Sequence, residues 1–462
     1  MALSLDQERA LQLFNEGKNM FLTGPGGSGK SFLIQLFKST SEYNGKKIAV
    51  TALTGCAAIL LGNEAMTIHG WSGIGLGQNS VEDTCKYIRT RGNTTSYRRW
   101  LNTDVLVIDE ISMMSCKILE LLNIVGKTIR KNSRPFGGIQ LIFAGDFFQL
   151  PPVDSKSNFT SNFTSNFTSN SNTYAFESTM WQEIVPNAIE LTYNHRQSDP
   201  VFQKILQEVR YGSLSPETIS ILESKKIKGN VLPTAAIDSL IKPTILYSRK
   251  SDVEATNKKE LEKLNNPITT FIVTSVNALS DRAVGNTIFN RAALSDRAVG
   301  INISASEQKQ AAKLDNDCNY NISLNLCVDA QVMLIINLDI SEGLVNGSRG
   351  IIKSFSEKGL PIVEFLNGKV VEIDYHIWRL TEFDPFGRRQ IPLCVAYAIT
   401  IHKVQGASLD YVLIDLGKSL FEDGQAYVAL SRVRNLEGLF IYSLDVNKIT
   451  ANGKVVEFYS RI

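Results

Sequence analysis

The residues best suited to chemistry lie near the N-terminus, in Gly24-Pro25-Gly26-Gly27-Ser28-Gly29-Lys30-Ser31. The stretch matches G-x-x-x-x-G-K-[ST], follows an apolar run at 19–23 and opens a helical pattern over 31–38. Glycines let backbone N–H groups converge on phosphate oxygens, and a helix N-terminus adds a favourable dipole. We predict that these eight residues bind ATP, with Lys30 on the β- and γ-phosphates and the Ser31 hydroxyl on Mg²⁺. A Gly-rich turn without a ligand is the alternative.

A second group of candidates follows two later apolar runs. The run at 105–108 ends in Asp109 and Glu110, and the run at 141–144 leads to Gln149. Charge at the carboxyl edge of a parallel sheet lies where α/β proteins bind ligands. We therefore predict that Asp109 holds Mg²⁺, that Glu110 activates the attacking water, and that Gln149 touches the γ-phosphate or orients that water. The alternatives are a helix cap for the two acids and an ordinary loop glutamine.

The elements that must position these residues are short apolar runs separated by amphipathic helical patterns. Such runs predict a parallel sheet buried on both faces, and hence an α/β fold. From 331 to 374 the pattern changes to close-set β segments with turn signals between them, which predicts a small barrel-like β unit. The predicted later elements are strands at 331–336, 350–355, 361–365, 369–373, 395–399 and 411–414 and a helix at about 424–433.

Composition limits the remaining possibilities. A chain of 462 residues predicts two to four domains, and a net charge of +2 means that a nucleic-acid site must be a local patch. The six cysteines form no C-x-x-C pair, which argues against structural zinc and fits a reducing intracellular compartment. No apolar run reaches the roughly 18 residues of a membrane span. We therefore predict a soluble protein. It carries two loop expansions to which we assign no function. One is the Ser-Asn-Phe-Thr repeat segment at 157–170, which we predict to be disordered, and the other is the duplication at 278–300.

Two longer stretches carry a resemblance to a known family. Residues 134–153 read RPFGGIQLIFAGDFFQLPPV, and residues 398–408 read AITIHKVQGAS. They resemble the petite integration frequency (Pif) family of superfamily-one DNA helicases, which are RecD-like; Val404 is a mild departure from its pattern. The resemblance runs over about 5–440, except the repeats and most of 213–325.

The resemblance implies two RecA-like P-loop NTPase domains with a small wedge insertion and an SH3-like β insertion. The implied bounds are 1–195 for the first domain (wedge at about 75–100, low-complexity loop at 155–173), 196–330 and 386–462 for the second (variable insertion at about 265–325), and 331–385 for the SH3-like insertion.

The resemblance also assigns nucleotide-binding roles that spacing alone does not. Gln7 matches the family's adenine-reading glutamine, although Ser4-x-x-Gln7 is also a helix capping box. Arg196 and Arg432 match two arginines that reach the γ-phosphate from an interdomain cleft, where they would stabilise transition-state charge. For Arg432, a surface charge on a helix is the alternative. Gly406 joins the implied nucleotide-binding set.

The implied contacts to nucleic acid come from four stretches of the chain. Polar groups and cations that grip the backbone suit a sequence-neutral motor. The stretch 86–100 is basic and aromatic and matches the wedge, although a solvated charged helix is the alternative; His69 could equally be structural. The implied contact residues are Thr54, Gly55, Thr67, His69, Arg98, Arg99, Thr400, His402 and Lys403.

The function implied by the resemblance is an ATP-dependent DNA helicase. It would move 5′-to-3′ on single-stranded DNA and unwind tailed duplex in replication, repair, recombination or telomere maintenance, as a monomer in the nucleus or cytoplasm (of a host cell if viral). The polarity rests on the resemblance alone. One alternative is a DNA-stimulated ATPase and translocase that acts on RNA–DNA hybrids or bound proteins without processive unwinding, and quadruplexes are a further implied substrate. A nucleic-acid-binding scaffold with an inactive ATPase is the other.

Overall fold

The computed structural model divides into two compact units. The first unit is Met1–Ile221, Leu416–Leu436 and Asp445–Ile462, and the second is Leu222–Asp415 and Glu437–Leu444. The division into domains drawn from the resemblance has other bounds and stays a prediction. Both repeats and Gly406 lie outside the described residues, which are all except 1–2, 63–64, 76, 78, 91–93, 153–172, 228–240, 278–303, 319, 340, 380–385, 406 and 418.

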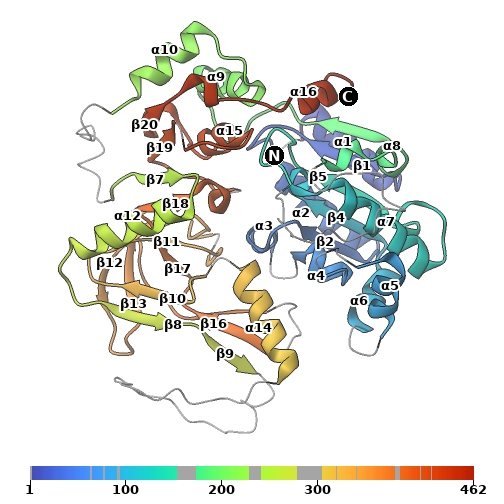
Figure 1. Cartoon of the computed structure of the whole chain (residues 1–462), viewed down its shortest axis with the longest axis horizontal. Helices are drawn as coiled ribbons and strands as arrows, with labels where there is room; N and C mark the ends of the chain where they lie inside the picture. The colour runs from blue at the N-terminus through green and yellow to red at the C-terminus, as the bar shows by residue number, and fades with distance from the viewer. Residues whose placement is uncertain are drawn as a thin grey trace. The chain divides into compact units, whose positions relative to one another are not determined.

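A six-stranded parallel sheet forms the middle of the first unit (Figure 1). The strand order is β3-β2-β4-β5-β1-β6, and β4 and β5 are buried along their whole length, as central parallel strands covered on both faces should be. The predicted α/β class is confirmed. The strands are β1 (Met20–Thr23), β2 (Ile48–Ala52), β3 (Met66–Thr67), β4 (Val105–Asp109), β5 (Gln140–Ala144) and β6 (Asn187–Glu190).

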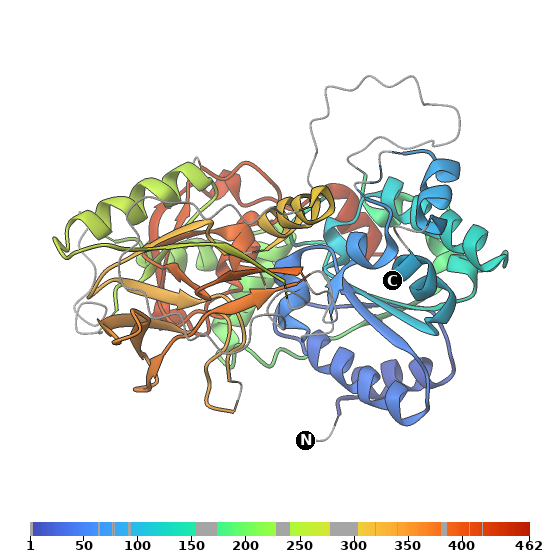
Figure 2. The same ribbon diagram turned by 90° about the horizontal axis from the view of Figure 1, so that it is seen from below.

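Helices cover both faces of this sheet (Figure 2). Alternate residues of β1 point to opposite faces. Met20 and Leu22 join a core with α1 and α2, whereas the ring of Phe21 meets Trp181 of α8 with centroids 5.6 Å apart. The helices of this unit include α1 (Leu5–Asn15), α2 (Lys30–Tyr43), α3 (Gly55–Leu60), α4 (Ile68–Ser72), α5 (Val81–Arg89), α6 (Thr94–Asn102), α7 (Cys116–Arg130), α8 (Trp181–Ile184), α9 (Pro200–Tyr211), α15 (Gln425–Leu430) and α16 (Gly453–Tyr459), and α10 (Pro216–Ser224) crosses to the second.

The second unit contains a smaller sheet in the order β18-β7-β19-β20, in which β18, β7 and β19 are parallel. Its strands and long helices are β7 (Thr244–Tyr247), β18 (Ala398–Thr400), β19 (Val412–Leu416), β20 (Leu439–Leu444), α12 (Lys250–Glu262) and α14 (Ala305–Asp317).

Three antiparallel sheets complete the second unit. The largest, β14-β13-β12-β11-β17, confirms the β segments predicted between 331 and 374, and Pro361–Phe365 forms one strand as expected. The others pair β15-β16-β9 and β10-β8. The strands are β8 (Thr269–Ile272), β9 (Thr274–Asn277), β10 (Ser323–Leu326), β11 (Gln331–Leu334), β12 (Arg349–Phe355), β13 (Pro361–Phe365), β14 (Val370–Glu372), β15 (His376–Trp378), β16 (Phe386–Gln390) and β17 (Leu393–Val395).

The single strand predicted at 395–399 is wrong, because the chain changes sheets within it. The Ala396 N–H donates to the Gln331 carbonyl at 2.9 Å, which continues the pairing of β17 with β11. One residue later, the Tyr397 carbonyl accepts from the Ile245 N–H at 2.8 Å, where the pairing of β18 with β7 begins. An uninterrupted apolar run cannot reveal such a change of partner.

In the described part of the chain, no helix is long and apolar enough to cross a bilayer.

Candidate nucleotide-binding site

The predicted phosphate loop joins β1 to the start of α2. Gly27 needs its glycine, since it has φ +90° and an added Cβ would lie 2.5 Å from the Cβ of Arg196. At Gly24, with φ +139°, a Cβ would lie 2.5 Å from the Leu191 carbonyl oxygen. Because the first N–H groups of a helix have no partner within the helix, the start of α2 offers donors to an anion held in this loop.

Lys30 folds back over the loop that precedes it. Its Nζ donates to the carbonyl oxygens of Gly24 at 2.7 Å and Pro25 at 3.0 Å. Burial lowers the pKa of Lys30, and the charges of nearby Asp146, Glu110 and Asp109 oppose that shift. An ammonium held by neutral carbonyl oxygens can exchange them for the stronger charged acceptors of a phosphate group.

The two predicted acids lie at the carboxyl end of β4. The Glu110 N–H donates to the Asp109 carboxylate at 2.9 Å, and burial raises the pKa of Asp109 to about 7. Glu110 has φ 55° and ψ 43°, a left-handed conformation that costs about 1–3 kcal/mol in residues other than glycine and clusters at functional sites. This bend begins the short turn Ile111–Met113.

Asp109 and Ser31 provide oxygen donors of the kind that Mg²⁺ takes. Ser31 is exposed in the first turn of α2, and Asp109 is a nearly buried carboxylate. Mg²⁺ usually binds one or two protein oxygens together with substrate phosphates rather than a cage of side chains. Within the described residues, no cluster of three or more His, Cys, Asp or Glu offers such a cage. The donor set therefore fits Mg²⁺ that arrives with a phosphate ligand.

Gln149 follows the end of β5 and is buried. Its backbone N–H donates to the Asp146 carbonyl oxygen at 2.9 Å. This bond closes a turn at the carboxyl edge of the sheet, where β4 and β1 flank β5. Gln149 thus lies on the same edge as the phosphate loop and the two acids.

The two predicted arginines lie against the phosphate loop within the first unit. A Cβ added to Gly26 would lie 3.3 Å from Nη2 of Arg432. Arg196 donates to the Ser431 carbonyl at 3.0 Å, so its chain segment is tied to the end of α15. Burial and the charge of Arg432 lower the pKa of Arg196 to about 9. Arg432 is only 2% exposed, which excludes a surface charge for this residue.

The sequence offered two roles for Gln7, a helix cap and a contact with adenine. Its backbone N–H donates to the Ser4 hydroxyl at 3.3 Å, and its Oε1 accepts from the Ser4 N–H at 3.1 Å, so the capping box is present. A Cβ added to Gly29 would lie 3.0 Å from Nε2 of Gln7. The side chain therefore caps α1 and borders the phosphate loop, while its adenine contact stays a prediction.

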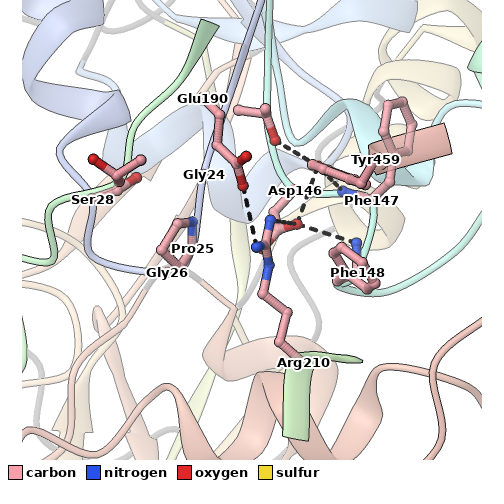
Figure 3. A network of polar contacts seen from close by, with 12 residues as sticks. Gly24, Pro25, Gly26, Ser28, Asp146, Phe147, Phe148, Glu190, Arg210 and Tyr459 are labelled. Atoms are coloured by element: carbon pink, nitrogen blue, oxygen red, sulfur yellow. Dashed lines mark hydrogen bonds and ion pairs between the residues drawn. The ribbon is translucent and has the colours of Figure 1, made fainter. Parts of the chain in front are cut away.

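A buried polar network beside the loop was missed by the sequence analysis. The Asp146 carboxylate is fully buried and accepts from Nε and Nη2 of Arg210 at 3.0 Å each (Figure 3). Tyr427 and Tyr459 each donate a hydroxyl to it at 3.2 Å, and Arg210 also contacts Glu190 at 3.3 Å. Asp146 lies in the motif at 134–153, but its partners come from distant segments with no common spacing.

Replacing Asp146 with asparagine is expected to destabilise the first unit by about 3–5 kcal/mol, since it leaves the buried Arg210 cation without its main counter-charge. Urea unfolding measures the effect. The control is Lys204→Gln, which breaks an ion pair with Glu217 whose side chains are 53% and 67% exposed and should cost less than about 1 kcal/mol. Equal unfolding midpoints for the two variants would contradict the importance of the buried pair.

The nucleic-acid candidates of the first unit have mixed environments. The Thr67 hydroxyl caps α4 by accepting from the Gly70 N–H at 3.1 Å, and Nδ1 of His69 lies 2.9 Å from the Gly75 carbonyl oxygen. Arg99 turns inwards and donates to the Gly70 carbonyl at 3.0 Å, whereas Arg98 is exposed. Arg98 and Arg99 border a cavity of about 390 Å³ with Lys38 and Lys47. Thr54 accepts from the Ala57 N–H at 3.2 Å, and Gly55 begins α3.

The remaining candidates belong to the second unit. Thr400 ends β18 and precedes a short turn, Ile401–Val404, that carries the half-buried His402 and the exposed Lys403. Thr400 and Lys403 border a cavity of about 810 Å³ within this unit.

Comparison with known proteins identifies the family. A family model described as PIF1-like helicase matches residues 2–218, and one described as DNA helicase Pif1, 2B domain, matches residues 311–355. The crystal structure of Pif1 helicase from Candida albicans is 31% identical, covers 100% of this chain and 99% of that chain, and has a TM-score of 0.76. The chain belongs to the PIF1-like helicase family.

Further relatives show how far this likeness extends. The ATP-dependent DNA helicase PIF1 of Mus musculus is 34% identical over 100% of this chain, and the chain spans 63% of the mouse protein. A Pif1 helicase from Bacteroides, solved in complex with ADP-AlF3 and ssDNA, is 25% identical with a TM-score of 0.67, covering 100% of this chain and 97% of that one. The PIF1-like assignment thus extends over both units.

Proposed function

We propose that the chain is an ATP-dependent DNA helicase that moves 5′-to-3′ on single-stranded DNA and unwinds tailed duplex. The observation that carries the ATPase part is the convergence of Arg196 and Arg432 on Gly27 and Gly26 of the phosphate loop. A plain phosphate-binding loop has no need of a buried Arg432 and a half-buried Arg196 packed against it. The names of the PIF1 relatives and the Bacteroides complex support nucleotide and DNA as ligands.

The proposed hydrolysis uses groups that the first unit already holds at one sheet edge. Glu110 accepts a proton from the attacking water while the water oxygen forms a bond to the γ-phosphorus. The bond from that phosphorus to the bridging oxygen then breaks, and ADP leaves with this oxygen. Gln149 orients the water, while Lys30 and the two arginines stabilise negative charge on the phosphoryl oxygens. Ser31 and Asp109 would hold Mg²⁺, which neutralises phosphate charge when bound.

Each unit carries its own proposed contacts to DNA. In the first unit they would include Thr54, Gly55, Thr67, His69 and the exposed Arg98, and in the second Thr400, His402 and Lys403. Hydroxyls and cations of this kind contact phosphates without reading bases. We propose two RecA-like domains with a wedge and an SH3-like insertion, working as a monomer in the nucleus or cytoplasm. RNA–DNA hybrids and quadruplexes are included as possible substrates.

Strand displacement on two matched duplexes tests this proposal. One duplex carries a 5′ single-stranded tail and the other a 3′ tail of the same sequence and length. We expect ATP-dependent strand release from the 5′-tailed duplex alone. Release from the 3′-tailed duplex alone would show 3′-to-5′ movement and contradict the proposed polarity. ATP hydrolysis that is stimulated by single-stranded DNA without any strand release would replace the helicase with a translocase.

A further inference from the structure

Tyr427 makes a direct bridge between α15 and the phosphate loop. Its hydroxyl accepts from the Gly26 N–H at 3.0 Å and donates to the Asp146 carboxylate at 3.2 Å. The side chain is only 2% exposed, and burial raises the pKa of Tyr427, so the hydroxyl keeps its proton. The bridge thus joins a helix near the C-terminus to the loop between β1 and α2.

Asp146 fixes the direction of the bridge. An ionised carboxylate only accepts hydrogen bonds, so the Tyr427 O–H must point to it and present a lone pair to the Gly26 N–H. Arg210 holds the same carboxylate through two bonds of 3.0 Å, which limits its rotation. The Asp146–Arg210 pair therefore orients the hydroxyl of Tyr427.

Arg432 follows α15 closely in the chain. Its guanidinium is held by its own helix end, where Nε donates to the Val428 carbonyl at 3.0 Å and Nη2 to the Ser431 hydroxyl at 2.8 Å. The position of this guanidinium beside Gly26 therefore depends on where α15 lies relative to the loop. The Tyr427 hydroxyl bonds directly to Gly26 and so helps to fix that placement, together with the bond from Arg196 to the Ser431 carbonyl.

We propose that Tyr427 is a positioning residue that places Arg432 against the phosphate loop for ATP hydrolysis, with Asp146 and Arg210 orienting its hydroxyl. The inference rests on the proposed ATPase function of the same site. An arginine that reaches transferred phosphate can contribute about 10³–10⁵ in kcat. A misplacement of about 1 Å can cost about a hundredfold. Removing the hydroxyl should therefore lower kcat by about 10- to 100-fold and change KM for ATP less than about threefold.

A double-mutant cycle on kcat tests whether Tyr427 acts through Arg432. Tyr427→Phe keeps the ring and removes the hydroxyl, and it is measured in the parent and in Arg432→Ala, with single-stranded DNA present. If the hydroxyl acts by placing the arginine, Tyr427→Phe has no further effect in the Arg432→Ala background. Equal fold-losses in both backgrounds would overturn the proposal, as would a rise in KM with kcat unchanged.

Tyr397→Phe is the matched control. Tyr397 is 6% exposed, and its hydroxyl accepts from the Gln331 N–H at 3.2 Å in the second unit, so the substitution removes the same kind of bond elsewhere. Its kcat should equal that of the parent, and thermal melts should show that both tyrosine variants are folded. A parent without ATPase activity would refute the proposed function itself, whereas an active parent with independent effects would refute only the role of Tyr427.

Discussion

Lys30→Ala is expected to abolish ATP turnover, lowering kcat/KM by about a thousandfold or more. The Lys30 ammonium lies within the loop and donates to the Gly24 and Pro25 carbonyl oxygens, which it would exchange for phosphate oxygens. Alanine leaves the charge that develops on those oxygens without this cation. Steady-state phosphate release with single-stranded DNA measures the loss.

The control for this substitution is Lys46→Ala, which removes an exposed ammonium in the segment after α2. It should hydrolyse ATP at the parental rate. The two variants differ in whether the lost charge faces the loop or the solvent, so their comparison separates a local role from a change in net charge. Parental activity in Lys30→Ala would place the nucleotide outside residues 24–31.

Much of the candidate nucleotide site could be predicted because its determinants are local. A glycine-rich loop between a strand and a helix, and acids that directly follow a buried strand, are each contained in a short stretch of chain. In a parallel sheet the carboxyl ends of neighbouring strands share one edge, so local patterns at β1, β4 and β5 also predict that Lys30, Asp109 and Gln149 meet there.

The rest depends on contacts between distant segments. Asp146 and Tyr459 are 313 residues apart, and Asp146 and Tyr427 are 281 apart, so no periodicity relates them. Arg99 illustrates a different limit of sequence-based prediction. It lies in a basic stretch, which predicts contact with nucleic acid. In the structure its guanidinium turns towards the protein and donates to the Gly70 carbonyl, the Ser96 hydroxyl and the Met66 sulfur, because α6 packs against α4. Spacing shows that a charge is present but not which way it turns.

Glu110→Gln is expected to stop hydrolysis while ATP binding survives, with kcat reduced about 10²- to 10⁴-fold. Glutamine has nearly the same shape as glutamate but cannot take the proton of the attacking water. The Glu110 backbone lies in a left-handed bend that glutamine must adopt just as glutamate does, so the substitution adds no new backbone strain. Single-turnover hydrolysis and equilibrium binding of a fluorescent ATP analogue measure the two properties separately.

The separation of binding from turnover is what distinguishes Glu110 from its neighbour. Asp109 is the proposed Mg²⁺ ligand, so Asp109→Asn should weaken nucleotide binding as well as hydrolysis, whereas Glu110→Gln should affect hydrolysis alone. Glu42→Gln, at the exposed end of α2, serves as a control for the loss of a carboxylate. If Glu110→Gln hydrolysed ATP like the parent, the base would have to be another group at the same sheet edge. If it failed to bind ATP, the carboxylate would belong to the nucleotide site rather than to the activation of water.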